Sequence, residues 1–155
     1  MVVSRDAIRF SILEPGDDYF AKEKEVWRVF IKTIQQAIDQ EEVNKIYVDA
    51  THLNAKSRNM LLSQLWFDKN VIVCTLCFNV CLAVCLKRNA MRTGRACVPE
   101  NKITEMFSSL RFPKEGERYI DFSILIDKDG EFITYEKIGR RCDNVKVLAD
   151  FGLAL

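Results

Sequence analysis

Acidic, basic and hydroxyl side chains follow two short apolar runs of the chain, over residues 1–3 and 46–48. These polar residues are Ser4, Arg5, Asp6, Arg9, Asp49 and Thr51. Ligands of open α/β sheets bind beyond the carboxyl ends of the strands, so this placement predicts a binding site. Carboxylates there can accept a hydroxyl proton or hold Mg²⁺, and arginines neutralise charge on a transferred phosphoryl group.

A second group of charges lies within residues 87–95, a segment without any acidic residue. Its cations are Lys87, Arg88, Arg92 and Arg95. Arg88 and Arg92 are four residues apart, so on a helix they would share one face. A run of like charges usually forms a solvated helix face, and composition alone favours that interpretation. Together with the carboxylates, the same arginines would suit phosphoryl transfer, so both interpretations stay open at this point.

The whole chain is nearly neutral. Its 155 residues carry 23 Lys and Arg against 22 Asp and Glu, a formal net charge of +1. This excludes the simplest nucleic-acid-binding class, a strongly basic domain, so any polyanion site must be a local patch. Hydrophobic residues make up 48%, which is typical of a folded chain rather than a disordered one. The length predicts a single domain over residues 1–155 with a substantial core.

The six cysteines are expected to be reduced thiols of a cytoplasmic protein, because no charged-then-apolar leader precedes them. The longest apolar run, 71–86, is too short and polar to cross a bilayer, so no membrane partner is expected. Cys74 and Cys77 are the best zinc-ligand candidates, but on a strand they would point to opposite faces. His52 is the only histidine, which excludes a multi-histidine metal site, and we assign no residue as a metal ligand.

Strand and helix patterns alternate along most of the chain. Short apolar runs predict strands over 1–4, 46–51 and 71–78, the last one apolar throughout, as in a strand covered on both faces. Apolar residues at helical spacing predict helices over 21–40, 55–67 and 82–92, and a further one that starts at Pro99. Strands over 119–126 and 131–137 around Asp129-Gly130 predict a β-hairpin. The order predicts an α/β fold with a mainly parallel sheet flanked by helices and a C-terminal β-hairpin.

Local signals also predict a turn, a helix cap and a buried helix face. Residues 4–6 are predicted to form a polar turn that ends the first strand. Asn54 is predicted to cap the helix over 55–67. The apolar residues expected to face the core from that helix are Met60, Leu61, Leu65 and Trp66.

Three motifs together resemble the P-loop polynucleotide 5′-kinases. Arg5-Asp6-Ala-Ile-Arg9 resembles the R-D-x-x-R turn of that family, and Asp49-Ala-Thr51-His-Leu-Asn54 with Arg58 resembles its D-(A/T)-T-N-L-…-R element. The segment 86–95 with Val98-Pro99 resembles the family's arginine-bearing lid. The motifs occur in the family's order and cover about the first 115 residues, and the strand, hairpin and tail over 119–155 lie outside the resemblance.

The resemblance implies an ATP-dependent kinase that transfers the γ-phosphate to a hydroxyl group of nucleic acid or of a small molecule. Asp6 then corresponds to the general base that accepts the proton of the 5′-hydroxyl. Arg9 corresponds to the contact with a phosphate of the acceptor, and Arg5, Asp49 and Thr51 are grouped with it as acceptor-binding residues.

The resemblance also assigns the cofactor and the lid. The cofactor is ATP with Mg²⁺. Arg88 and Arg92 correspond to lid residues that hold the ATP phosphates, and Arg95 is grouped with them. Arg92 in addition stabilises charge in the transition state and so counts as catalytic.

One motif of the family is missing. The family needs G-x-x-x-x-G-K-[ST] to cradle the phosphates, and none of the six glycines here is followed by lysine. We therefore expect a truncated chain that lacks the P-loop strand, which belongs between the strands 46–51 and 71–78. Each unpaired buried backbone group costs about 1–3 kcal/mol, so the chain alone should be marginally stable or rearranged, and inactive. A partner chain that supplies the missing segment is then one expected partner.

Three functions remain open at the level of the sequence. The first is a kinase domain without its nucleotide-binding segment, with a nucleic acid or a small molecule as acceptor. The second is a non-catalytic module, derived from such a kinase, that binds nucleic acid or protein. The third is the product of a decayed gene.

Overall fold

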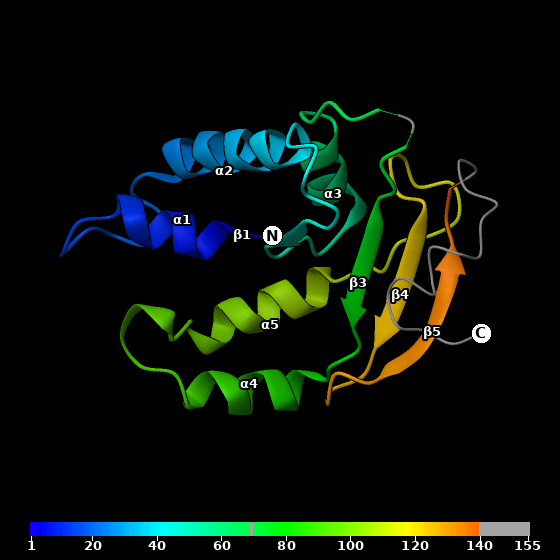
Figure 1. Cartoon of the computed structure of the whole chain (residues 1–155). Helices are drawn as coiled ribbons and strands as arrows, with labels where there is room; N and C mark the ends of the chain where they lie inside the picture. Colours follow the sequence, from blue (N-terminus) through cyan, green and yellow to red (C-terminus); the bar gives the residue numbers. More distant parts are fainter. Residues whose placement is uncertain (69, 140–155) are drawn as a thin grey trace. The chain divides into compact units, whose positions relative to one another are not determined.

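The computed structural model describes residues 1–68 and 70–139, which form a mixed α/β fold (Figure 1). The α/β class predicted from the sequence is confirmed. The chain divides into two compact units, which are described separately. Unit 1 contains Met1–His52 and Met60–Asp68, and unit 2 contains Leu53–Asn59 and, within the described part, residues 70–139. The single domain predicted from chain length stays a prediction.

Unit 1 combines a small parallel sheet with two helices. β1 (Val2–Ser4) pairs in parallel with β2 (Tyr47–Asp49). α1 (Arg5–Ile12) follows β1 directly, and α2 (Glu23–Ile38) packs against both α1 and β1. The predicted strands and the long helix are therefore confirmed, with slightly shorter bounds.

The start of α1 differs from the prediction of a polar turn over residues 4–6, which is wrong. Ser4 is the N-cap of α1, and its side chain accepts a hydrogen bond from the backbone N–H of Ala7. Asp6 lies in the first turn, where a carboxylate complements the positive end of the helix dipole. The same polar residues that suggest a turn thus begin a helix.

The core of unit 1 forms along one face of α2. Its buried residues recur at helical spacing and are Val26, Phe30, Ile34 and Ala37. Phe30 and Ile34 pack with Val3 of β1 and with Leu61. Full burial of a side chain of this size contributes about 1.5–3 kcal/mol, so this cluster fixes β1 against α2. Because α1 starts where β1 ends, the cluster also fixes the start of α1.

Unit 2 contains a mixed three-stranded sheet. β3 (Cys74–Phe78) pairs in parallel with β4 (Phe122–Ile126), which pairs antiparallel with β5 (Phe132–Lys137). The turn between β4 and β5 uses Gly130 at a φ of 93°, a conformation that favours glycine. The predicted hairpin is confirmed.

The predicted mainly parallel sheet is wrong. The described strands form two small sheets, and in unit 2 the tight turn after Ile126 forces β5 to run antiparallel to β4. In the described part of the chain, β2 pairs with β1 alone and β3 with β4 alone. The expectation that β3 is covered on both faces is also wrong, because Leu76 and Phe78 are exposed.

The remaining helices are shorter than predicted. α3 (Ala55–Leu62) ends five residues before the predicted end, while α4 (Leu82–Ala90) and α5 (Glu100–Ser109) flank a single 3₁₀ turn, η1 (Gly94–Ala96). Among the described helices, none combines the length and the apolarity that crossing a membrane requires.

The predicted cap of α3 is confirmed, but its predicted inward face is only partly correct. The backbone N–H of Ser57 donates to Asn54 Oδ1 at 3.1 Å. Leu61 is buried, whereas Met60 and Trp66 are exposed. The helix ends at Leu62, so Trp66 no longer follows the helical spacing that would turn it inward.

Candidate functional site

The carboxyl ends of β1 and β2 lie side by side and carry most of the predicted acceptor-binding residues. Ser4 is directly opposite Asp49 in the parallel register. Arg5 and Asp6 follow Ser4 as the first residues of α1, and Thr51 follows β2. Asp6, Asp49 and Thr51 are exposed to solvent. Strand pairing therefore brings two accessible carboxylates to one end of this sheet.

Asp6 is the most clearly oriented of these side chains. Its Oδ1 accepts a hydrogen bond from Arg9 Nη1 at 2.5 Å and another from the Tyr19 hydroxyl at 2.7 Å. The side chain is nevertheless 61% exposed. Two donors thus fix a carboxylate that a substrate hydroxyl can still reach, the geometry needed for proton acceptance.

Arg9 provides that orientation from a buried position. Its Nη1 donates to Tyr19 Oη at 2.7 Å as well as to Asp6, and its Nη2 donates to Glu23 Oε2 at 2.7 Å. The guanidinium also lies 4.3 Å from the centre of the Tyr19 ring. The contact of Arg9 with an acceptor phosphate stays a prediction. In the present geometry Arg9 is a positioning residue for Asp6.

Arg5 shares the carboxylate of Glu23 with Arg9. Arg5 Nη2 donates to Glu23 Oε1, and its guanidinium lies 5.1 Å from the centre of the Trp27 ring. Burial, and secondly the charge of Arg9, lower the pKa of Arg5. Glu23 therefore holds two like charges together at the start of α2.

Sequence reasoning missed Tyr19 and Glu23. Burial raises the pKa of Tyr19, and the hydrogen bond that its hydroxyl donates to Asp6 raises it further. Arg5 and Arg9 are four residues apart, so both lie on one face of α1 and both need acidic partners when that face packs. Glu23, an acidic residue in the first turn of the next helix, was the available signal for this partner.

The predicted lid arginines lie in unit 2. Arg88 lies in the last turn of α4, and its Nη2 donates to the backbone carbonyl of Lys128 at 2.5 Å. Arg92 follows the helix, and Arg95 lies in η1. All three side chains are exposed. The prediction that Arg88 and Arg92 share a helix face is wrong, because α4 ends at Ala90.

Asn89, which the sequence did not single out, organises this arginine segment. Its Nδ2 donates to the Val98 carbonyl at 2.7 Å, and the Val98 N–H donates back to Asn89 Oδ1 at 2.9 Å. The pair closes a loop over residues 90–97 that presents Arg92 and Arg95. Because the buried Asn89 amide uses both its nitrogen and its oxygen in hydrogen bonds, it holds the two ends of this loop together.

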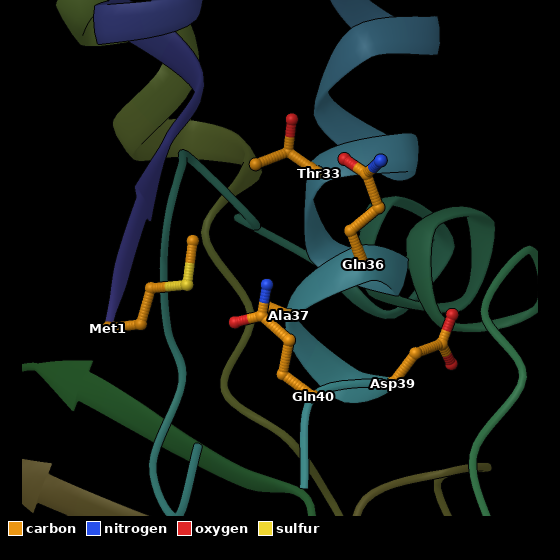
Figure 2. Close-up of a pocket in the computed structure, with 6 residues that line it drawn as sticks. All are labelled: Met1, Thr33, Gln36, Ala37, Asp39 and Gln40. Atoms are coloured by element: carbon orange, nitrogen blue, oxygen red, sulfur yellow. The ribbon is translucent and has the colours of Figure 1, made fainter. Parts of the chain in front are cut away.

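Other features of the described residues do not add to this site. No three His, Cys, Asp or Glu side chains within residues 1–68 and 70–139 are grouped for metal binding. Burial raises the pKa of the Cys74 thiol to about 12, so this thiol stays protonated at neutral pH. A pocket of about 380 Å³ lies at the end of α2 and contains none of the predicted site residues (Figure 2). Its lining consists of Met1, Thr33, Gln36, Ala37, Asp39 and Gln40.

No family model matches the chain, and neither a curated protein nor a solved structure is significantly similar to it. The chemistry and the geometry of the residues described above therefore carry the functional proposal.

Proposed function

We propose that this chain is part of an ATP-dependent kinase domain of the P-loop polynucleotide-kinase type, acting in the cytoplasm. In this proposal, unit 1 binds the 5′-hydroxyl end of a nucleic-acid acceptor. The observation that carries the proposal is the accessible Asp6 carboxylate, which Arg9 and Tyr19 orient at the carboxyl ends of two parallel strands. Ligand sites in α/β folds occupy this position.

In the proposed reaction, Asp6 accepts the proton of the 5′-hydroxyl while that oxygen bonds to the γ-phosphorus of ATP. The bond between the γ-phosphorus and the β,γ-bridging oxygen breaks, and ADP leaves. Arg5, Asp49 and Thr51 contribute to acceptor binding at the same end of the sheet. Orientation by two hydrogen bonds keeps Asp6 in place before the acceptor arrives.

Unit 2 contributes cations for the phosphates of ATP with Mg²⁺. Arg88, Arg92 and Arg95 are exposed, and the bonds between Asn89 and Val98 hold the loop that carries two of them. Guanidinium groups suit phosphate oxygens because they offer several donors in a planar fork. We assign charge neutralisation in the transition state to Arg92.

The proposal requires a further segment or a partner chain to supply the phosphate-cradling loop. The 155 residues contain no G-x-x-x-x-G-K-[ST] sequence. This chain by itself should therefore bind an acceptor without efficient phosphate transfer.

A binding assay on the chain alone tests the role of unit 1. A single-stranded oligonucleotide with a 3′ fluorophore is titrated by anisotropy, once with a 5′-hydroxyl and once with a 5′-phosphate. We expect tighter binding of the 5′-hydroxyl form, because the Asp6 carboxylate repels a phosphate. Asp6→Asn should remove the preference for the 5′-hydroxyl form. The control Asp39→Asn, at the C-terminal end of α2 and outside the proposed site, should keep this preference.

Three outcomes would contradict parts of the proposal. Absence of oligonucleotide binding removes the acceptor role of unit 1, and a preference that Asp6→Asn leaves unchanged removes the role of Asp6. Efficient transfer from labelled ATP by this chain alone would contradict the requirement for another segment. If a longer reading frame with the phosphate-cradling loop binds the oligonucleotide but transfers no phosphate, the non-catalytic binding module is the better explanation.

A further inference from the structure

A cluster of three aromatic side chains, here called the aromatic cluster, contacts Asp6 in unit 1 through a half-buried tyrosine and has two exposed phenylalanines. It consists of Phe10 of α1 and of Tyr19 and Phe20 in the loop before α2. The ring centres of Phe10 and Tyr19 are 6.2 Å apart, and those of Tyr19 and Phe20 are 4.8 Å apart. Both pairs meet edge to face, an arrangement that is favourable for aromatic rings.

Phe20 is held in place by its backbone and by Arg9. Its N–H donates to Asp18 Oδ1 at 2.9 Å, and its carbonyl accepts from the Glu23 N–H at 3.2 Å. The Arg9 guanidinium lies 5.9 Å from the centre of the Phe20 ring, within the range of a cation–π contact. The ring is therefore positioned before any ligand binds.

Phe20 is nevertheless 64% exposed. A single exposed apolar side chain is common on protein surfaces and needs no function by itself. Phe20 differs because its neighbour Tyr19 donates its hydroxyl to Asp6 and contacts Phe20 with its ring. The Tyr19 side chain thus contacts both the Asp6 carboxylate and the exposed Phe20 ring.

We infer that Phe20 is the stacking surface for the terminal base of a single-stranded nucleic-acid acceptor whose 5′-hydroxyl lies at Asp6. This inference rests on the proposed function and names its substrate class. Stacking needs only an exposed π face and tolerates any base sequence. It requires a base, so the site selects acceptors with a terminal base over acceptors without one.

The test uses the chain alone, the 5′-hydroxyl oligonucleotide described above, and a matched oligonucleotide whose first nucleotide is abasic. Phe20→Ala should weaken binding of the intact oligonucleotide roughly tenfold, and Phe20→Trp should retain it. The abasic oligonucleotide should bind the native protein about as weakly as the intact oligonucleotide binds Phe20→Ala. Phe20→Ala should not weaken binding of the abasic oligonucleotide further. Trp66→Ala, which removes another exposed aromatic ring of unit 1, should leave both affinities unchanged.

The outcomes separate this inference from the proposed function. If the chain distinguishes 5′-hydroxyl from 5′-phosphate through Asp6 but Phe20→Ala binds normally, only the stacking role fails. If Phe20→Ala weakens intact and abasic oligonucleotides equally, Phe20 supports the site structurally and stacks on no base. If no oligonucleotide binds, the proposed function fails as well. Circular dichroism checks that each variant is folded.

Discussion

Among the described residues, each unit buries one arginine in an ion-pair network, and the two networks differ in how far they are exposed to solvent. In unit 2, Arg58 donates from Nε and Nη2 to the two carboxylate oxygens of Glu117, at 2.6 and 2.8 Å. Its Nη1 donates to the carbonyl of Arg111 at 2.9 Å. Glu117 is only 7% exposed, so this network is closed off from water. It joins the start of α3 to residues 111–117.

The network of Arg9 in unit 1 opens toward the surface. Its partners are Glu23, which is 33% exposed, and Asp6, which is still more exposed. The buried Arg58 network holds two segments of the fold together. The Arg9 network instead fixes the orientation of Asp6, a carboxylate that solvent and substrate can reach. The same residue type thus has a structural role in unit 2 and a positioning role in unit 1.

The largest expected effect is that of Glu117→Gln. The change replaces a buried carboxylate, which accepts two hydrogen bonds from Arg58, by a neutral amide, so we expect a loss of about 3–5 kcal/mol in the free energy of unfolding. Urea denaturation followed by circular dichroism measures it. The control is Glu105→Gln in the exposed pair Lys102–Glu105 of the same unit, which should change stability by less than about 1 kcal/mol. Equal effects of the two changes would contradict the closed network.

Glu23→Gln makes the matched change in unit 1, with a smaller expected effect. Arg9 keeps its bonds to Asp6 and Tyr19, and water can reach position 23, so we expect a loss of about 1–2 kcal/mol. The two tryptophans of the chain, Trp27 and Trp66, both belong to unit 1, so tryptophan fluorescence during urea denaturation reports on it. A loss as large as that of Glu117→Gln would mean that the Arg9 network is as closed as the Arg58 network.

The smallest effect concerns the titration of Tyr19. Burial and the hydrogen bond to Asp6 raise its pKa above 10.0, so Asp6→Asn should move the pKa back toward that value without reaching it. Ultraviolet absorbance of the phenolate measures the shift, and Tyr19→Phe identifies which of the four tyrosines is responsible. An unchanged Tyr19 pKa in Asp6→Asn would contradict the described contact.

The same pKa shift predicts a pH dependence of stability. The folded chain favours the neutral phenol of Tyr19 more than the unfolded chain does. This contribution to stability is fully present below pH 10.0, the unfolded value, and is lost as the pH rises through the raised pKa of folded Tyr19. Urea denaturation at rising alkaline pH should show a shallower loss for Tyr19→Phe than for the native chain.

Local sequence signals predicted the elements whose stability is local. Helical spacing of Val26, Phe30 and Ile34 predicted α2, and Asp129-Gly130 predicted the hairpin, because each pattern directly reflects one buried face or one turn. The carboxyl-end rule for strands predicted that the polar residues after the two strands lie at one end of a sheet. The parallel register of β1 and β2 places Ser4 opposite Asp49, while the role of these residues as a site stays a prediction.

Tertiary contacts decided the remaining features. α1 has eight residues, too few to be stable as an isolated helix, and its Arg9 bonds to Glu23 fourteen positions later. The position of Arg92 depends on where α4 ends and on the contact of Asn89 with Val98. None of these pairings has a periodic signature, since each joins groups whose proximity arises only after the chain has packed.

The sequence by itself determined the α/β class, the main helix, the hairpin and the residue types suited to phosphate chemistry, because composition and periodicity act over a few neighbouring residues. The tertiary structure alone decided which carboxylate is oriented and accessible. The orientation of Asp6 depends on Tyr19 and on the burial of Arg9, and both depend on the packing of α1 against α2. Burial and the distance between segments are properties of the folded chain, and they decide that Asp6, rather than another acidic residue, is held in a fixed orientation.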